Sequence, residues 1–158
     1  MKKIFGRIKI IPAKEAHIKY LADNMREEDK REVMAASGDG PLEALNKSFS
    51  TAKYCFTAFY EGAPLCMFGI NPQGFISNRA CLWLLGTDKV KKCPKDFCRA
   101  TLYFVNAFLK EYDILFNFVD ARYESSINWL IFAGAEFNES KPYGKEKLPF
   151  KYFEIRRT

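Results

Sequence analysis

The chain has 158 residues, 48% of them hydrophobic and 28% charged, which suits one globular domain with a sizeable core. Its formal net charge is +6 with acidic and basic residues interspersed, so anionic ligands are favoured while an arginine-rich nucleic-acid-binding segment is absent. No apolar run is long enough to span a membrane, and Gly6, Arg7 and Lys9 interrupt the apolar start, which excludes a signal peptide.

The five cysteines are odd in number and include no CxxC pair. We interpret them as free thiols in a reducing compartment, and therefore expect a cytoplasmic protein. His17 is the only histidine, so no metal site is predicted.

The first third of the chain predicts a short strand followed by three helices. Apolar and charged residues alternate over 7–12, as in a strand with one buried face. Helices are predicted over 13–25, 27–36 and 41–49. Gly38 can end the second of these helices in a left-handed conformation, and Pro41 suits the first turn of the third.

The middle of the chain predicts three consecutive strands and a long helix. Strands over 54–60 and 65–70 flank the Glu61-Gly62 turn, and a third, apolar strand covers 80–85. Apolar residues recur at helical spacing after Pro94. Residues 113–119 then form a second buried strand, and the intervening helix predicts that it lies parallel to the strand over 80–85.

The last quarter predicts a short helix capped by Ser125 or Ser126 and ended by Gly134, followed by a strand pair that ends with a strand over 150–155. Taken together, the elements predict an α/β (α+β) fold in a single domain, 1–158. Its mixed central sheet should have about six or seven strands, with helices on both faces.

The junction between the apolar strand and the long helix is the first candidate binding site. Gly86 and Thr87 end the strand, and three lysines lie between them and the helix: Lys89, Lys91 and Lys92. Backbone N–H groups and the helix dipole converge at such a junction, which favours a phosphorylated ligand. The alternative is an ordinary packing unit with a solvated lysine loop, because one basic loop is a weak motif.

Four stretches of sequence resemble the GNAT fold (Gcn5-related N-acetyltransferases), and the resemblance covers nearly the whole chain. They are FYEGAPLCMFGI (59–70), LWLLGTDKV (82–90), VDARYESSINWLIFAGAEF (119–137) and KYFEIRR (151–157). More narrowly, NMREEDKREV (24–33) together with LWLLGTD and VDARYESSINWL resembles a GNAT-like family that tailed phages encode, grouped with phage internal virion proteins.

The GNAT resemblance implies an acetyl-CoA site between the two parallel strands, which diverge in this family. Backbone groups of Leu84, Leu85 and Gly86 would pair with the pantetheine arm of the cofactor. The other cofactor-binding residues that it implies are Thr87, Lys89, Lys91, Lys92 and Asn128. The acceptor would be an amine or a protein that the sequence does not identify.

The sequence also departs from the GNAT pattern in three places. No glycine lies between Thr87 and Phe97, whereas most members have glycines in this loop. Tyr123 stands where many members have an asparagine that contacts CoA. Leu130 stands where many have the tyrosine that protonates the leaving thiolate.

N-acyl transfer requires a base for the amine and an acid for the thiolate. Acidic residues on the second helix and at the strand ends are the candidate bases: Glu28, Asp29, Glu32, Asp88 and Asp120. We predict Glu32 and Asp120 as catalytic carboxylates and Tyr123 as the acid. Solvated surface charge is the alternative for each carboxylate, and packing in the core or at the rim of the site is the alternative for Tyr123.

Two functions therefore remain open from the sequence. The first is an N-acyltransferase that uses acetyl-CoA. The second is a catalytically inactive GNAT-fold phage protein that binds virion or host proteins, located in the host cytoplasm or in the virion. Neither reading involves nucleic acid or a membrane, and the oligomeric state is open.

Overall fold

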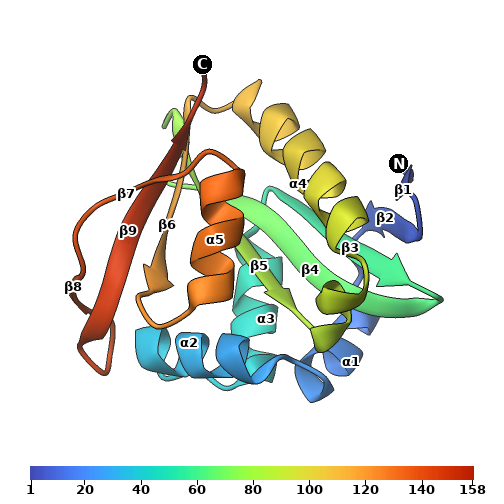
Figure 1. Cartoon of the computed structure of the whole chain (residues 1–158), viewed down its shortest axis with the longest axis horizontal. Helices are drawn as coiled ribbons and strands as arrows, with labels where there is room; N and C mark the ends of the chain where they lie inside the picture. Colours follow the sequence, from blue (N-terminus) through green and yellow to red (C-terminus); the bar gives the residue numbers. More distant parts are fainter.

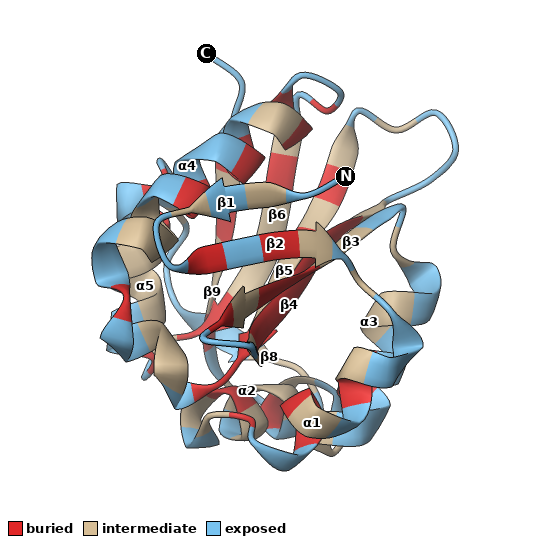
Figure 2. Ribbon diagram, turned by 90° about the vertical axis from the view of Figure 1, so that its right-hand side faces the viewer, coloured by how far each residue is buried: buried red, intermediate tan, exposed pale blue.

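The computed structural model describes all 158 residues as one mixed sheet with helices on both faces (Figures 1 and 2). The nine strands follow the order β1-β2-β3-β4-β5-β6-β9-β7, and β8 pairs with β9. The strands are β1 (Lys3–Phe5), β2 (Ile8–Pro12), β3 (Tyr54–Tyr60), β4 (Ala63–Pro72), β5 (Arg79–Gly86), β6 (Ile114–Asp120), β7 (Glu136–Phe137), β8 (Lys141–Tyr143) and β9 (Leu148–Arg156).

The α-helices are α1 (Ile18–Asp23), α2 (Glu27–Ser37), α3 (Pro41–Thr51), α4 (Pro94–Leu109) and α5 (Glu124–Phe132). Two short 3₁₀ helices, η1 (Glu15–His17) and η2 (Asp88–Lys92), precede α1 and α4. The helix α2 ends at Gly38, whose φ of 77° is left-handed as predicted, and α4 begins at Pro94.

The strands β5 and β6 form the only parallel pair in the sheet, and α4 connects them. All the other neighbours are antiparallel. This confirms the predicted parallel arrangement and places the carboxyl ends of β5 and β6 at the same side of the sheet.

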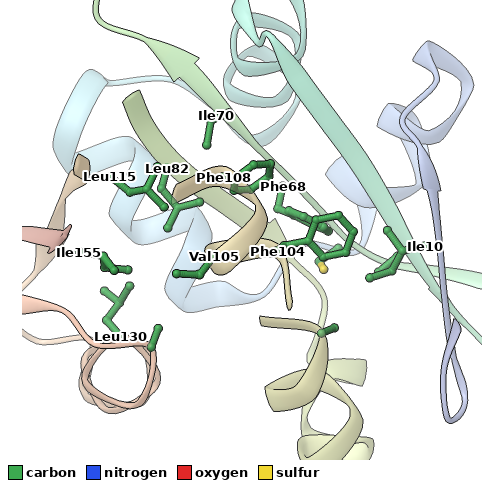
Figure 3. Close-up of a cluster of buried hydrophobic side chains, with 14 of the residues drawn as sticks. Ile10, Phe68, Ile70, Leu82, Phe104, Val105, Phe108, Leu115, Leu130 and Ile155 are labelled. Carbon is green, nitrogen blue, oxygen red and sulfur yellow. The ribbon is translucent and has the colours of Figure 1, made fainter. Parts of the chain in front are cut away.

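Alternating side chains of the central strands supply two separate cores. On one face, α4 and α5 cover a cluster that includes Phe68, Leu82, Phe104 and Leu130 (Figure 3). On the other face, α1 and α3 pack on a smaller cluster that includes Met67 and Leu85. Burial of each such side chain contributes about 1.5–3 kcal/mol to the free energy of unfolding. Both faces of the sheet therefore help to stabilise β4 and β5, which supply residues to both clusters.

Three predictions about the elements were wrong. Neither Ser125 nor Ser126 caps the last helix, because α5 already begins at Glu124 with Tyr123 as its N-cap. The helix predicted over 13–25 is only α1 and the η1 turn, because the Ala13 N–H still donates to the Cys55 carbonyl at the edge of β3. The sheet has nine strands instead of six or seven. The additional strands β1, β7 and β8 have two or three residues each, too short to give a periodic pattern.

The turn between β8 and β9 is attached to the C-terminal end of α2. The Lys145 and Glu146 N–H groups donate to the Ala36 and Ala35 carbonyls, at 3.0 and 3.1 Å. Gly144 allows this approach, because a Cβ atom there would lie 2.7 Å from the Ala36 Cα. The contact fixes α2 against the end of the sheet where β5 and β6 terminate.

We predict that Gly144→Ala destabilises the protein by about 2–3 kcal/mol or more, since it combines a left-handed φ with a backbone clash. Gly62→Ala is the matched control. Gly62 has a similar φ of 81° and open space around it, so its substitution should cost only about 1 kcal/mol. Urea unfolding measures both, and equal losses would show that the packing on α2 contributes nothing.

Candidate functional site: a cleft between two diverging strands

The strands β5 and β6 separate after a short paired segment. Arg79, Ala80 and Cys81 of β5 pair with residues 114–116 of β6. Beyond Cys81 and Phe116, the two strands no longer pair with each other. The Asn117 side-chain amide donates to the Leu82 carbonyl at 2.8 Å where the strands part. Figure 1 shows the two strands diverging toward α2. The expected gap between the strand ends is therefore confirmed.

A cleft of about 440 Å³ occupies this gap and is lined from both faces of the sheet. On the face of α4 and α5, its walls include Phe97, Cys98 and Trp129, and on the opposite face they include Trp83 and Tyr143. Aromatic side chains thus line the cleft without filling it. A cleft of this size is within the range of small-molecule sites.

At the end of β5, backbone groups point alternately toward β4 and into the gap. The Thr87 N–H donates to the Leu65 carbonyl of β4, and strand alternation turns the backbone groups of Leu85 the same way. The N–H and C=O groups of Leu84 and Gly86 therefore point into the gap. Those of Gly86 already have partners, because its N–H donates to Asp29 Oδ2 at 2.8 Å and its C=O accepts from the Arg26 N–H at 2.9 Å.

The three lysines of the basic loop point in different directions. Lys91 lines the cleft and forms an exposed ion pair with Asp88 at 3.5 Å. Lys89 donates instead to the Tyr20 hydroxyl at 2.5 Å and lies over that ring. Lys92 is exposed and does not line the cleft. Only Lys91 therefore combines with the start of α4, where Pro94 also lines the cleft, to make that end electropositive.

The Asp29 carboxylate joins the two sides of the gap. It accepts from the Gly86 N–H on one side and from the Tyr123 hydroxyl, at 2.7 Å, on the other. Arg26 binds it through Nε and Nη2, and the Asp29 side chain is only 2% exposed. Every strong acceptor direction of this buried carboxylate thus has a donor, which is the condition for keeping a charge inside a protein.

Glu32 lies one turn further along α2 and lines the cleft. Its Oε2 accepts from the Asp120 N–H at 3.0 Å, whereas Oε1 has no protein partner. Burial raises the pKa of Glu32 to about 8, and the charges of Asp29 and Asp120 add to the rise against the opposing effect of Arg26. A carboxyl group with one oxygen fixed and its pKa close to neutrality can accept a proton from a ligand.

The other two predicted catalytic residues lie beside Glu32 but do not line the cleft. Burial opposes ionisation of Asp120, yet the hydrogen bonds and charge of Arg122 lower its pKa, and their side chains meet at 2.7 Å. Burial raises the pKa of Tyr123, as does the charge of Asp29. The Tyr123 hydroxyl is already donated to Asp29. Its contact with the gap is therefore indirect.

Three further residues lie or act differently from what the sequence indicated. Asn128, expected to contact the cofactor, is exposed on α5 and does not line the cleft. Asn117 was missed, although a lone amide inside the apolar run ILFNFV (114–119) was a signal of a special position. Arg26 was missed although Asp29 follows it by three residues, because the burial of this pair depends on how α2 packs.

The arrangement of strands and helices is the GNAT acetyltransferase fold. The ribosomal-protein-alanine N-acetyltransferase from Brucella melitensis superposes with a TM-score of 0.72 at 14% identity, over 94% of this chain and 99% of that one. A spermidine N-acetyltransferase from Vibrio cholerae, in complex with CoA and spermine, gives 0.69 at 11% identity over 95% of both chains. A GNAT-family acetyltransferase from Bacillus anthracis gives 0.69 at 14% identity, over 99% and 98%.

No protein-family model and no curated protein sequence matches this chain. At these identities the structural matches establish the fold alone, and nothing in them supports the narrower phage grouping. No helix has the length and apolar character needed to cross a membrane.

We predict that Asp29→Asn destabilises the protein by about 3 kcal/mol, because it leaves the largely buried Arg26 guanidinium without its counter-charge. Asp23→Asn is the matched control. Asp23 pairs with Lys19 on the surface, with its side chain 60% exposed, and its loss should cost less than about 0.5 kcal/mol. Chemical unfolding would contradict this role of Asp29 if the two variants lost equal stability.

We predict that Glu32→Gln stabilises the protein at alkaline pH. The pKa of Glu32 rises from 4.5 to about 8 on folding, so the unfolded chain releases a proton that the folded chain retains. Stability contributed by this group therefore falls as pH rises from about 4.5 to 8. Because the side chain is partly open to the cleft, we expect a gain of about 1–2 kcal/mol above pH 8 and none near pH 4. Urea unfolding across this range measures the difference, and a gain independent of pH would contradict the shift.

Proposed function

We propose that this protein is an N-acyltransferase that takes its acyl group from acetyl-CoA. The observation that carries the proposal is the cleft itself, which forms where β5 and β6 separate and is lined from both faces of the sheet. Such a cleft lets a thioester enter from one face and an amine from the other.

The α4 face is the proposed entry for acetyl-CoA. Lys91 and the first turn of α4 supply positive charge for the pyrophosphate, although the loop offers no glycine. The apolar walls from Leu82 to Leu84 fit the flexible arm of the cofactor. The Leu84 C=O is the backbone acceptor of β5 that remains for pairing with the amides of this arm.

The chemistry assigned to the protein's own residues is acid–base and electrostatic. Glu32 accepts a proton from the incoming ammonium or amine through Oε1, while the Asp120 N–H holds Oε2 in place. The Leu84 N–H is the donor available to a developing oxyanion. Asp120 and Tyr123 act by holding Glu32 and Asp29. The amine attacks the acetyl carbonyl of acetyl-CoA, the C–S bond breaks as the C–N bond forms, and the CoA thiolate leaves with the proton that Glu32 took from the amine.

Titration with acetyl-CoA by calorimetry tests the proposal. We expect micromolar binding, and Lys91→Glu should weaken it by about 10-fold because the reversed charge repels the pyrophosphate. The control is Lys2→Glu, which changes the net charge equally at an exposed residue outside the cleft. No binding at millimolar acetyl-CoA would overturn the proposal, and equal effects of both variants would remove Lys91 from the site.

A binding protein without turnover is the second candidate, acting on virion or host proteins as the phage resemblance implied. The observation that favours it is the occupation of Gly86, whose N–H and C=O are taken by α2 and are unavailable to a ligand. Leu130, buried at 3% exposure where a catalytic tyrosine is common, also fits this function. Absence of acetyl-CoA binding would favour this candidate.

A further inference from the structure

The side of the cleft opposite α4 and α5 is lined by α2 together with Trp83, Phe118 and Tyr143, and we call it the α2 face. Most charged side chains along it are paired within the protein. Asp29 pairs with Arg26 at 3.0 Å, and Asp39 pairs with Lys47 at 3.0 Å. Both pairs line the cleft. Among the carboxylates that line it, only Glu28 and Glu32 lack a cationic partner.

A polyamine carries several ammonium groups along its length, and each needs a carboxylate or a carbonyl when it leaves water. Glu28 and Glu32 are the two unpaired carboxylates that line the cleft. The cleft therefore offers fewer free carboxylates than a polyamine has ammonium groups. This charge balance does not match a polyvalent acceptor.

The large side chains on the rest of the α2 face are apolar or aromatic, and Ser37 and Ser48 line the cleft beside them. Phe118 and Tyr143 stack with ring centroids 3.9 Å apart and both line the cleft. Trp83 stands on the β5 side, and its indole N–H is already donated to Asn71 at 2.6 Å. Its ring is therefore an apolar wall with no unsatisfied donor. Such walls favour an apolar or aromatic body by burial and stacking.

We propose that the acceptor is a small primary monoamine whose body is apolar or aromatic, with the amino group at Glu32 and the body between Trp83 and the Phe118–Tyr143 pair. This inference rests on the proposed N-acyltransferase function and specifies its acceptor. It separates this chain from a polyamine acetyltransferase that shares its fold.

The test compares two amines as acceptors for acetyl-CoA with the full-length protein. The probes are 2-phenylethylamine and spermidine, with acetylated product measured by mass spectrometry. We expect kcat/KM for 2-phenylethylamine to exceed that for spermidine by about 10-fold or more, the discrimination that one buried aromatic body supplies.

A variant that changes the charge of the cleft tests whether the preference between the two amines arises there. Lys47→Gln frees the Asp39 carboxylate, and because Lys47 is 67% exposed the fold should tolerate the change. The ratio of kcat/KM for spermidine to that for 2-phenylethylamine should then rise by about 3–10-fold. Lys19→Gln, the same substitution on the exposed surface of α1 and also beside an aspartate, should leave the ratio unchanged.

The outcomes separate the two levels of the proposal. Preference for spermidine, or a ratio that Lys47→Gln does not move, overturns the acceptor class and leaves the acyltransferase function standing. Binding of acetyl-CoA with no transfer to either amine also overturns the acceptor class. Absence of acetyl-CoA binding removes the function and the inference together.

Discussion

One buried carboxylate holds the open end of the sheet in its shape. Asp29 accepts a hydrogen bond from Gly86 at the tip of β5 and another from Tyr123 just beyond β6. Where the parallel strands β5 and β6 separate, their backbone N–H and C=O groups would otherwise have no hydrogen-bond partner inside the protein. Each unsatisfied group would cost about 1–3 kcal/mol. The Arg26 guanidinium lies 3.0 Å from the carboxylate, and so the bridge depends on an ion pair contributed entirely by the start of α2.

The same requirement explains the other polar residues along the gap. Asn117 satisfies the Leu82 carbonyl where the strands part, and Glu32 satisfies the Asp120 N–H at the end of β6. What remains on the β5 edge is the backbone of Leu84. The gap is therefore mostly satisfied by the protein's own side chains, and the position left for a ligand lies near its middle.

The sequence predicted elements with strong periodicity or clear turn chemistry. The parallel pair, the long helix after Pro94 and the end of α2 at Gly38 all belong to this group. It did not predict the directions of the three lysines, because the attachment of Lys89 to Tyr20 is a contact between residues 69 positions apart. The role of Asn117 was missed for the same reason, since the Leu82 carbonyl is 35 positions away. Arg26 is only three residues from Asp29, but the burial of this pair beside Gly86 is set by packing, which no local pattern encodes.

The cleft has two electrically different ends, and this difference gives the proposed reaction a direction. At the α4 face, Lys91 and the helix N-terminus present positive charge to an anionic donor. At the α2 face, the cations are paired with Asp29 and Asp39, so the unpaired carboxyl groups of Glu28 and Glu32 determine what approaches. In the proposed reaction, an anionic thioester and an amine would therefore be drawn to opposite openings. Their reactive atoms would meet where the strands part, beside the apolar walls of the cleft, where a lower local dielectric strengthens each electrostatic interaction.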